Sequence, residues 1–138
     1  MKNVLKIMLA GSLLWSSAAF AEVAVIVHKS NTDDLSPELI QRIFLGKTKG
    51  FPSAGKAVPL DLPQDTQSRA DFLAKVVKKT QSQYTAYWAK LMFTGKGVPP
   101  KEADTANDVV TLVGKNPNMI GYVDASEVTA DVRVVAKF

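Results

Sequence analysis

The sequence predicts an α/β domain in which helices flank a small mixed sheet. Residues 23–27 (Val-Ala-Val-Ile-Val) form a short, continuous apolar run, which is typical of a strand buried on both faces. Further strand-like runs lie at residues 119–123 and 132–135. Between these runs, apolar side chains recur at helical spacing in four segments, at residues 36–46, 65–77, 82–92 and 105–113. Strands thus alternate with helices, the pattern of layered α/β domains.

The first 21 residues have the organisation of a secretory signal peptide. Lys2 and Lys6 give a basic start, an apolar run follows at residues 7–15, and Ala19-Phe20-Ala21 is a small-residue cleavage pattern. The apolar run is shorter than the roughly 20 residues that a spanning helix needs. We expect cleavage after Ala21, with an uncleaved anchor as the alternative. The mature chain, residues 22–138, is then predicted to be one periplasmic domain without stable membrane insertion.

The composition excludes several classes of function. The formal net charge is +4, of which Lys2 and Lys6 supply two units, and the remaining lysines are scattered along the chain. Nucleic acid is therefore not an expected partner, because binding phosphates along a strand needs clustered Lys and Arg. The chain has no cysteine, so its stability must come from a packed core rather than from disulfides.

The first helix has clear start and stop signals. Ser36 can cap it, Pro37 suits its first position, and Gly46 suits the exit from its last turn. Its apolar face comprises Leu39, Ile40, Ile43 and Phe44. The last helix is expected to be capped by Thr105, with Asp108 three residues on in the manner of a capping box.

The middle of the chain is predicted from weaker signals. Residues 47–56 are expected to form a loop. Residues 57–62 are expected to form a strand that lies at a sheet edge or begins late, because Pro59 cannot donate a ladder hydrogen bond. The aromatic side chains in and after the third helix could form a stacking platform for bases or sugars. Their helical spacing instead favours a place in the core for Tyr84, Tyr87, Trp88 and Phe93.

A candidate anion site lies at residues 62–72, where a strand is expected to lead through a turn into a helix. Thr66, Ser68 and Arg69 cluster where the helix start exposes unpaired N–H groups. Hydroxyls can add hydrogen bonds, and an arginine can bind a phosphate or carboxylate through two parallel ones. The alternative is ordinary helix capping with a solvated Arg69.

The motifs of common enzymes are missing from the sequence. There is no nucleophile elbow, P-loop or dinucleotide fingerprint, and no paired carboxylates spaced for acid–base chemistry. The single histidine, His28, has no clustered ligands beside it, so neither a metal site nor a cofactor is expected. We therefore predict a protein that is not an enzyme. A hydrolase would require a serine within hydrogen-bond reach of His28.

Several segments together resemble one family, the phosphate-transporter substrate-binding proteins of the PstS-like group. Residues 43–47 (Ile-Phe-Leu-Gly-Lys) resemble its IFLGK segment, and residues 87–88 with 93–100 resemble a W…FTGKG.PP stretch of its short relatives. Residues 116–117 with 120–123 are similar to its NPGAIGYV ending. The resemblance extends over nearly the whole mature chain in the expected order. It implies one lobe of a type II periplasmic-binding-protein-like fold.

The resemblance also implies a ligand site. The family's SGTR..F motif opens a helix and contacts bound phosphate, and its counterparts here are Thr66, Gln67, Ser68, Arg69 and Phe72. Gln67 replaces a glycine that would let the backbone approach an oxyanion closely. The oxyanion-binding residues that the resemblance implies are thus Thr66, Gln67, Ser68 and Arg69.

The predicted function is binding of phosphate or a similar oxyanion, in connection with an uptake transporter or a sensing system. Full members of the family close two lobes on the ligand, and the mature chain has the length of one. A single lobe would bind weakly, would need a second subunit as the missing wall, or would bind something else. The alternative function is a periplasmic protein–protein adaptor that has kept the fold and lost ligand binding.

Overall fold

The computed structural model describes residues 21–138. Residues 1–20, and with them nearly all of the predicted signal peptide, lie outside the described residues, so its cleavage stays a prediction. No helix in residues 21–138 is both long enough and apolar enough to cross a bilayer.

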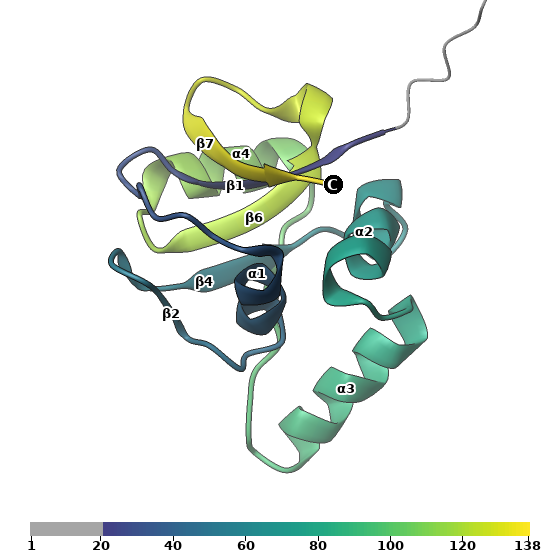
Figure 1. Ribbon diagram of the computed structural model, residues 1–138. Coiled ribbons are helices and arrows are strands. Elements are labelled where there is room, and N and C mark those ends of the chain that lie inside the picture. The colour runs from purple at the N-terminus through teal and green to yellow at the C-terminus, as the bar shows by residue number, and fades with distance from the viewer. Residues whose placement is uncertain (1–20) are drawn as a thin grey trace, which may run out of the picture.

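The centre of the described chain is a mixed sheet with the strand order β5-β4-β6-β1-β7 (Figure 1). Strand β1 runs antiparallel to both of its neighbours, β6 and β7, whereas β4 runs parallel to β6 and β5. All of residues 23–27 are buried, as the continuous apolar run predicts. The strands are β1 (Val23–His28), β4 (Val58–Asp61), β5 (Lys101–Glu102), β6 (Met119–Asp124) and β7 (Val132–Lys137).

Helices cover both faces of this sheet. They are α1 (Pro37–Phe44), α2 (Gln67–Phe72) with a continuing π-helical turn η1 (Leu73–Val77), α3 (Gln81–Phe93), α4 (Ala106–Lys115) and a short 3₁₀ turn η2 (Ala125–Glu127). Consecutive strand residues point to opposite faces. In β6, Gly121 faces α4, while Tyr122 faces α1 and α2. The predicted layered α/β lobe is therefore confirmed.

Gly121 lets α4 pack close to the sheet. A Cβ placed on this residue would lie 2.5 Å from Cγ1 of Val109 and 3.6 Å from Cγ2 of Val113, which is too close at the first of these contacts. The helix face that the sequence predicts from its valines is thus pressed against a strand residue with no side chain. Any substitution here would have to push α4 away from the sheet.

Three aromatic rings form the centre of the opposite layer. Phe72 stacks on Tyr122 with ring centroids 3.9 Å apart, and Phe44 meets the edge of Phe72 at 4.7 Å. All three side chains are fully buried. Helix α1, helix α2 and strand β6 are held together at this point by aromatic packing.

Helix α1 begins and ends as the sequence predicts. The Ser36 side chain accepts from the backbone N–H of Leu39, and Gly46 leaves the helix with φ of 68°. A Cβ on Gly46 would lie 2.9 Å from Cη2 of Trp88, so α3 packs closely against this turn. The hydroxyl of Tyr87 donates to the carbonyl of Leu45, 2.5 Å away, and strengthens the same junction.

Of two predictions for the middle of the chain, the loop is wrong, and the strand follows one of its two alternatives. Residues 50–56 contain a small hairpin of β2 (Gly50–Phe51) and β3 (Gly55–Lys56) instead of an unpaired loop, and the Asp33 carboxylate accepts from the backbone N–H groups of Ser53 and Ala54. Strand β4 does not lie at a sheet edge, but its pairing with β5 begins late, after Pro59. Its neighbour β5 pairs only with Leu60 and Asp61, so the sheet tolerates a proline that lacks an N–H.

The prediction for the third helix holds only in part. Tyr84 and Trp88 are buried, but Phe93 is 93% exposed, so the expected core place of Phe93 is wrong. Helix α3 extends away from the sheet, and its last turn lies beyond the elements that could cover it (Figure 1). The fourth helix is capped by Thr105, whose side chain accepts from the N–H of Asp108.

We predict that Phe72→Ala lowers the free energy of unfolding by about 3–5 kcal/mol, because it opens a cavity between Tyr122 and Phe44. The matched control is Phe93→Ala, which removes the same atoms from an exposed position and should change that free energy by less than about 0.5 kcal/mol. Urea unfolding followed by circular dichroism measures both values. Equal losses for the two variants would contradict the assigned core.

Candidate functional site

The candidate site lies where β4 ends and α2 begins. Thr66 is the N-cap residue of α2, but its side chain makes no capping hydrogen bond. Its hydroxyl instead donates to the carbonyl of Pro63, 2.7 Å away, and so fixes the turn that precedes the helix. The carboxamide of Gln67 donates to the Asp71 carboxylate at 2.8 Å, on the exposed side of the helix. The start of the helix is where the sequence places it, and its backbone N–H groups receive no side-chain cap.

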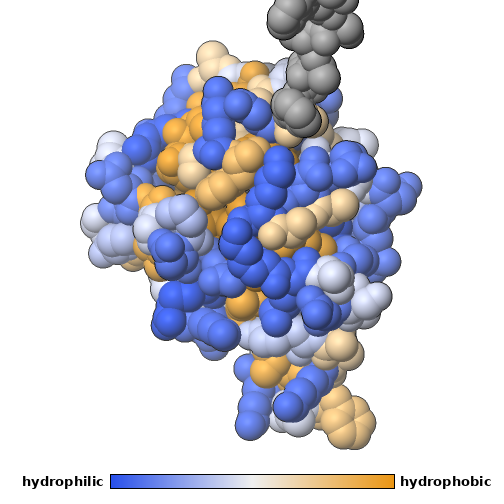
Figure 2. All heavy atoms as spheres, turned by 45° about the vertical axis from the view of Figure 1, so that its right-hand side comes forward, coloured by the Kyte–Doolittle hydropathy of each residue, from blue (hydrophilic) through white to orange (hydrophobic). Residues whose placement is uncertain are grey.

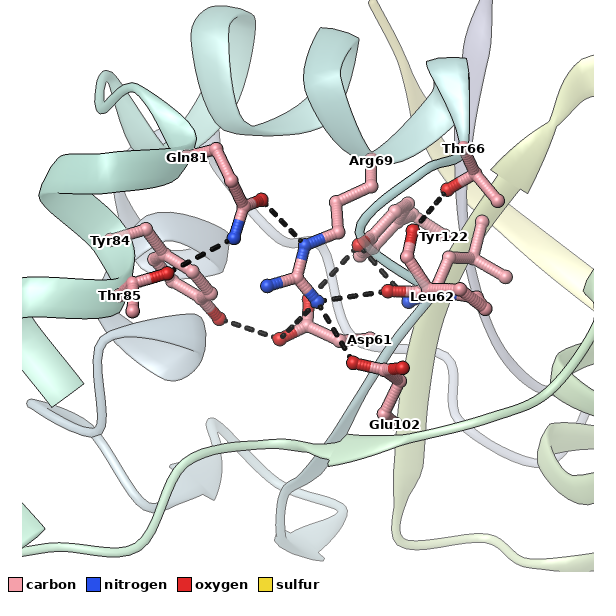
Figure 3. Close-up of polar contacts among 10 residues, drawn as sticks. Asp61, Leu62, Thr66, Arg69, Gln81, Tyr84, Thr85, Glu102 and Tyr122 are labelled. Carbon is pink, nitrogen blue, oxygen red and sulfur yellow. Dashed lines mark hydrogen bonds and ion pairs between the residues drawn. The ribbon is translucent and has the colours of Figure 1, made fainter. Parts of the chain in front are cut away.

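Arg69 points into the protein rather than toward solvent. Only 5% of the residue is exposed, so the predicted alternative of a solvated Arg69 is wrong. Its Nε donates to Oε1 of Gln81 and its Nη1 to the carbonyl of Leu62, both at 2.9 Å. Figure 3 shows the guanidinium below α2, between the end of β4 and the start of α3. The hydroxyl of Thr66 bonds a different carbonyl, so the predicted site residues do not share one hydrogen-bond network.

Two carboxylates accompany the guanidinium. Nη1 of Arg69 lies 3.5 Å from Oε2 of Glu102 and 3.9 Å from Oδ2 of Asp61. The Asp61 side chain is buried, whereas that of Glu102 is 52% exposed. Neither separation is a short hydrogen bond. The pair with Glu102 is open to water and therefore weak, whereas the pair with Asp61 is buried, so loss of its cation would be costly. One cation therefore lies between two anions, one of which is open to water.

Tyrosine hydroxyls hold the buried carboxylate in place. Tyr84 donates to Oδ2 of Asp61 at 2.8 Å, and Tyr122 donates to Oδ1 at 3.0 Å (Figure 3). Burial raises the pKa of Asp61 above its ordinary value of 3.8, and the two hydroxyls with the Arg69 charge offset only part of that rise. Burial next to the Asp61 charge likewise raises the pKa of both tyrosines, so both remain protonated donors at neutral pH.

Most of the remaining donor capacity of the guanidinium is at one atom. Within the part of the chain that the structure describes, Nη2 of Arg69 makes no hydrogen bond (Figure 3). A guanidinium presents five N–H donors, and with two of them bonded the three left over are both of those on Nη2 and one on Nη1, which faces the carboxylates. A ligand that accepts hydrogen bonds and carries negative charge is the chemical class that this atom suits.

Sequence reasoning located Arg69 but missed the groups that surround it. Asp61, Tyr84, Glu102 and Tyr122 come from β4, α3, β5 and β6, which are distant from one another along the chain. Asp61 did carry a signal, because it stands between Leu60 and Leu62 in an apolar strand. An acidic residue in such a position usually has a buried partner.

His28 does lie within hydrogen-bond reach of a serine. Its Nδ1 is 2.8 Å from Oγ of Ser30 and also accepts from the backbone N–H of Ser30 at 3.1 Å. Both bonds lie within one exposed turn. Among residues 21–138, no hydrogen bond connects the other ring nitrogen to a carboxylate that could orient the ring. The contact is that of a local turn and does not assemble the three-part arrangement of a hydrolase.

The sequence comparisons give no family. No protein-family profile and no curated protein sequence matches this chain.

Solved structures do match. One match is a structure from Clostridium perfringens, named as a putative phosphate ABC transporter substrate-binding protein with bound phosphate. It matches 83% of this chain with a TM-score of 0.66 and 23% identity. The fold is that of one lobe of a type II periplasmic binding protein. An ABC-type phosphate transport receptor from Vibrio cholerae (TM-score 0.65, 16% identity, 83% of this chain) and PstS from Borrelia burgdorferi (0.62, 11%, 84%) match similarly.

These structures are larger than this chain. The match covers 44% of the Clostridium protein, 45% of the Vibrio protein and 47% of the Borrelia protein, so the chain spans less than half of their length. At these identities the likeness establishes the shared fold. The resemblance stated from the sequence motifs is confirmed at that level, and the neighbours are binding proteins rather than enzymes.

We predict that Arg69→Met lowers the free energy of unfolding by about 3 kcal/mol at neutral pH, because Asp61 then carries a buried charge without its cation. The loss should shrink as the pH falls toward 3.8. An acid whose folded pKa is raised contributes most stability below its unfolded pKa and loses that contribution as the pH rises through the folded value. The variant raises that pKa further, so it suffers most at high pH.

Urea unfolding of the wild type and of Arg69→Met across this pH range tests the prediction. Asp61→Asn in the Arg69→Met background serves as the control, because it removes the group that titrates and should flatten the pH dependence. A loss of equal size at neutral and acid pH would show that Arg69 acts by packing alone.

Proposed function

We propose that this chain is a periplasmic solute-binding module that binds phosphate or a similar oxyanion, in connection with an uptake transporter or a sensing system. The observation that carries the proposal is the Arg69 guanidinium, which Leu62 and Gln81 hold in place while Nη2 remains free to donate. The likeness to a solute-binding protein that holds phosphate supports the same reading.

Binding is proposed to proceed by exchange at Glu102. An oxyanion that approaches Nη2 is repelled by Glu102, whose carboxylate lies 3.5 Å from Nη1. Glu102 lies on a strand of only two residues and its side chain is half exposed, so it can turn into water at little cost. The guanidinium then exchanges one carboxylate for the incoming anion, and the charge of the cluster changes little.

The other predicted residues would act around this anchor. Thr66 and Ser68 are half-buried near the start of α2, and their hydroxyls are proposed to donate to the same anion. Thr66 would have to release Pro63 to do so. Gln67 is exposed and its carboxamide is bonded to Asp71, so we expect it to contribute least to anion binding. Asp61 stays in place and keeps the guanidinium oriented.

We predict that Glu102→Gln strengthens the binding of inorganic phosphate about ten-fold, because it removes the competing charge but keeps the shape of the side chain. Isothermal titration calorimetry of the wild type and the variant measures this change. Glu38→Gln is the matched control, because Glu38 is exposed in the first turn of α1, away from Arg69, and should leave the affinity unchanged.

The absence of binding heat at millimolar phosphate, in both the wild type and Glu102→Gln, would remove the oxyanion proposal. An equal gain in the Glu38→Gln control would show that net charge, and not Glu102, sets the affinity.

The second candidate function is a periplasmic protein–protein adaptor. One observation favours it: Arg69 already faces two carboxylates, so the cluster holds more negative than positive charge when both are ionised. The same titration separates the two candidates. The adaptor would be supported if Glu102→Gln gives no binding heat with phosphate and the chain retains one defined protein in a pull-down from periplasmic extract.

A further inference from the structure

The end of α3 presents three large apolar side chains to solvent. Phe93 is 93% exposed, Val98 is 85% exposed and Met92 is 53% exposed, and no other large hydrophobic side chain in the described chain is as open. We call residues 90–98 the α3 tip. It forms the end of the molecule farthest from the sheet in Figure 1, and Figure 2 shows a protrusion at this end with hydrophobic and hydrophilic side chains side by side.

The α3 tip is an ordered turn. The N–H and hydroxyl of Thr94 both donate to the carbonyl of Lys90, at 3.1 and 2.9 Å. The N–H of Lys96 donates to the carbonyl of Leu91 at 2.8 Å, and Gly97 packs against the ring of Trp88, where a Cβ would lie 3.2 Å from it. The apolar side chains are therefore held outward by a hydrogen-bonded turn, and their exposure does not come from a frayed helix end.

The charge around the α3 tip has one sign. Residues 72–101 contain no Asp or Glu, and their cations are Lys75, Lys78, Lys79, Lys90, Lys96 and Lys101. Lys90 and Lys96 are exposed and flank Phe93 in the sequence. The loop after α1, which contacts Trp88 through Gly46, adds Lys47 and Lys49 and also lacks acidic residues. Lys47 and Lys96 each adjoin a glycine that packs against Trp88, so lysines from two separate segments of the chain lie near the α3 tip.

We propose that the α3 tip docks on the surface of a bilayer that contains anionic phospholipid. Lysines near such a surface are attracted to its phosphate-bearing headgroups, at about 1 kcal/mol each. Phe93, Met92 and Val98 then enter the boundary between headgroups and acyl chains, where exposed apolar area is removed from water. The contact is peripheral, and it leaves Arg69 and the start of α2 free.

Shape and composition favour lipid over a protein partner. The apolar side chains lie on a protruding turn, which suits a deformable medium better than the flat, well-packed surface of a protein interface. Protein interfaces are rich in Arg, Met and aromatic side chains but poor in Lys, so it is the lysines around Phe93 that favour lipid. At the α3 tip the exposed cations are lysines, while Tyr84 and Trp88 are buried. Apolar side chains among lysines match the chemistry of an anionic membrane surface.

Vesicle flotation tests this proposal with the purified full chain. Vesicles of phosphatidylcholine alone are compared with vesicles in which a third of the lipid is phosphatidylglycerol. We expect binding to the second kind only, weakened by high salt. Phe93→Ala should weaken it about ten-fold or more. Lys90→Glu with Lys96→Glu should weaken it by at least as much.

The controls address the rest of the chain. Residues 7–15 are apolar, so binding is judged by differences between variants that share the same N-terminus. Lys115→Glu with Lys137→Glu makes the same charge change on α4 and β7 and should leave binding nearly intact. Circular dichroism confirms that each variant remains folded.

Several outcomes would overturn the proposal. They are equal binding to both kinds of vesicle, no effect of Phe93→Ala, and an equal loss in the Lys115→Glu, Lys137→Glu control. A photo-crosslinker at position 93 that labels one protein partner and no lipid would assign the α3 tip to a protein instead. Phosphate titration reports on a different part of the molecule, so either proposal can fail without the other.

Discussion

The buried ion pair of Arg69 with Asp61 joins the parts of this domain that the sequence keeps apart. Arg69 belongs to α2, and its guanidinium bonds the end of β4 through Leu62 and the start of α3 through Gln81. Asp61 in turn accepts from tyrosines of α3 and β6. Charges out of water need complete partners. The cluster therefore fixes how the helices sit on the sheet, and any ligand site at this corner must be built around it.

This constraint explains how one corner can be structural and still hold a ligand. Leu62 and Gln81 position the guanidinium without any ligand, so an anion would meet a donor whose direction is already set. The half-exposed Glu102 is the one partner that can leave without opening the core. The matched solved structures are more than twice as long as the part that this chain matches. The proposed exchange at Glu102 involves only residues of this chain. A single face does leave the anion in contact with water, where each hydrogen bond contributes less.

Local chemistry accounts for most of what the sequence could predict. Ser36, Pro37 and Gly46 mark the ends of α1 because capping and left-handed exits depend on a few adjacent residues. The apolar run at residues 23–27 likewise indicates a buried strand from adjacent residues alone. Pro59 left open whether its strand lies at an edge or begins late, because only the length of the neighbouring strand decides which of the two occurs. Phe93 misled because its helix runs past the sheet that would have covered it. The partners of Arg69 could not be predicted, since tertiary contacts bring them together.

The most direct test of this account is a crystal structure of the chain with phosphate at high concentration. The account predicts an anion within hydrogen-bond distance of Nη2 of Arg69, with Glu102 turned into solvent and Asp61 still bonded to both tyrosines. An anion bound elsewhere, or an Arg69 still paired with Glu102 and without a ligand, would contradict it.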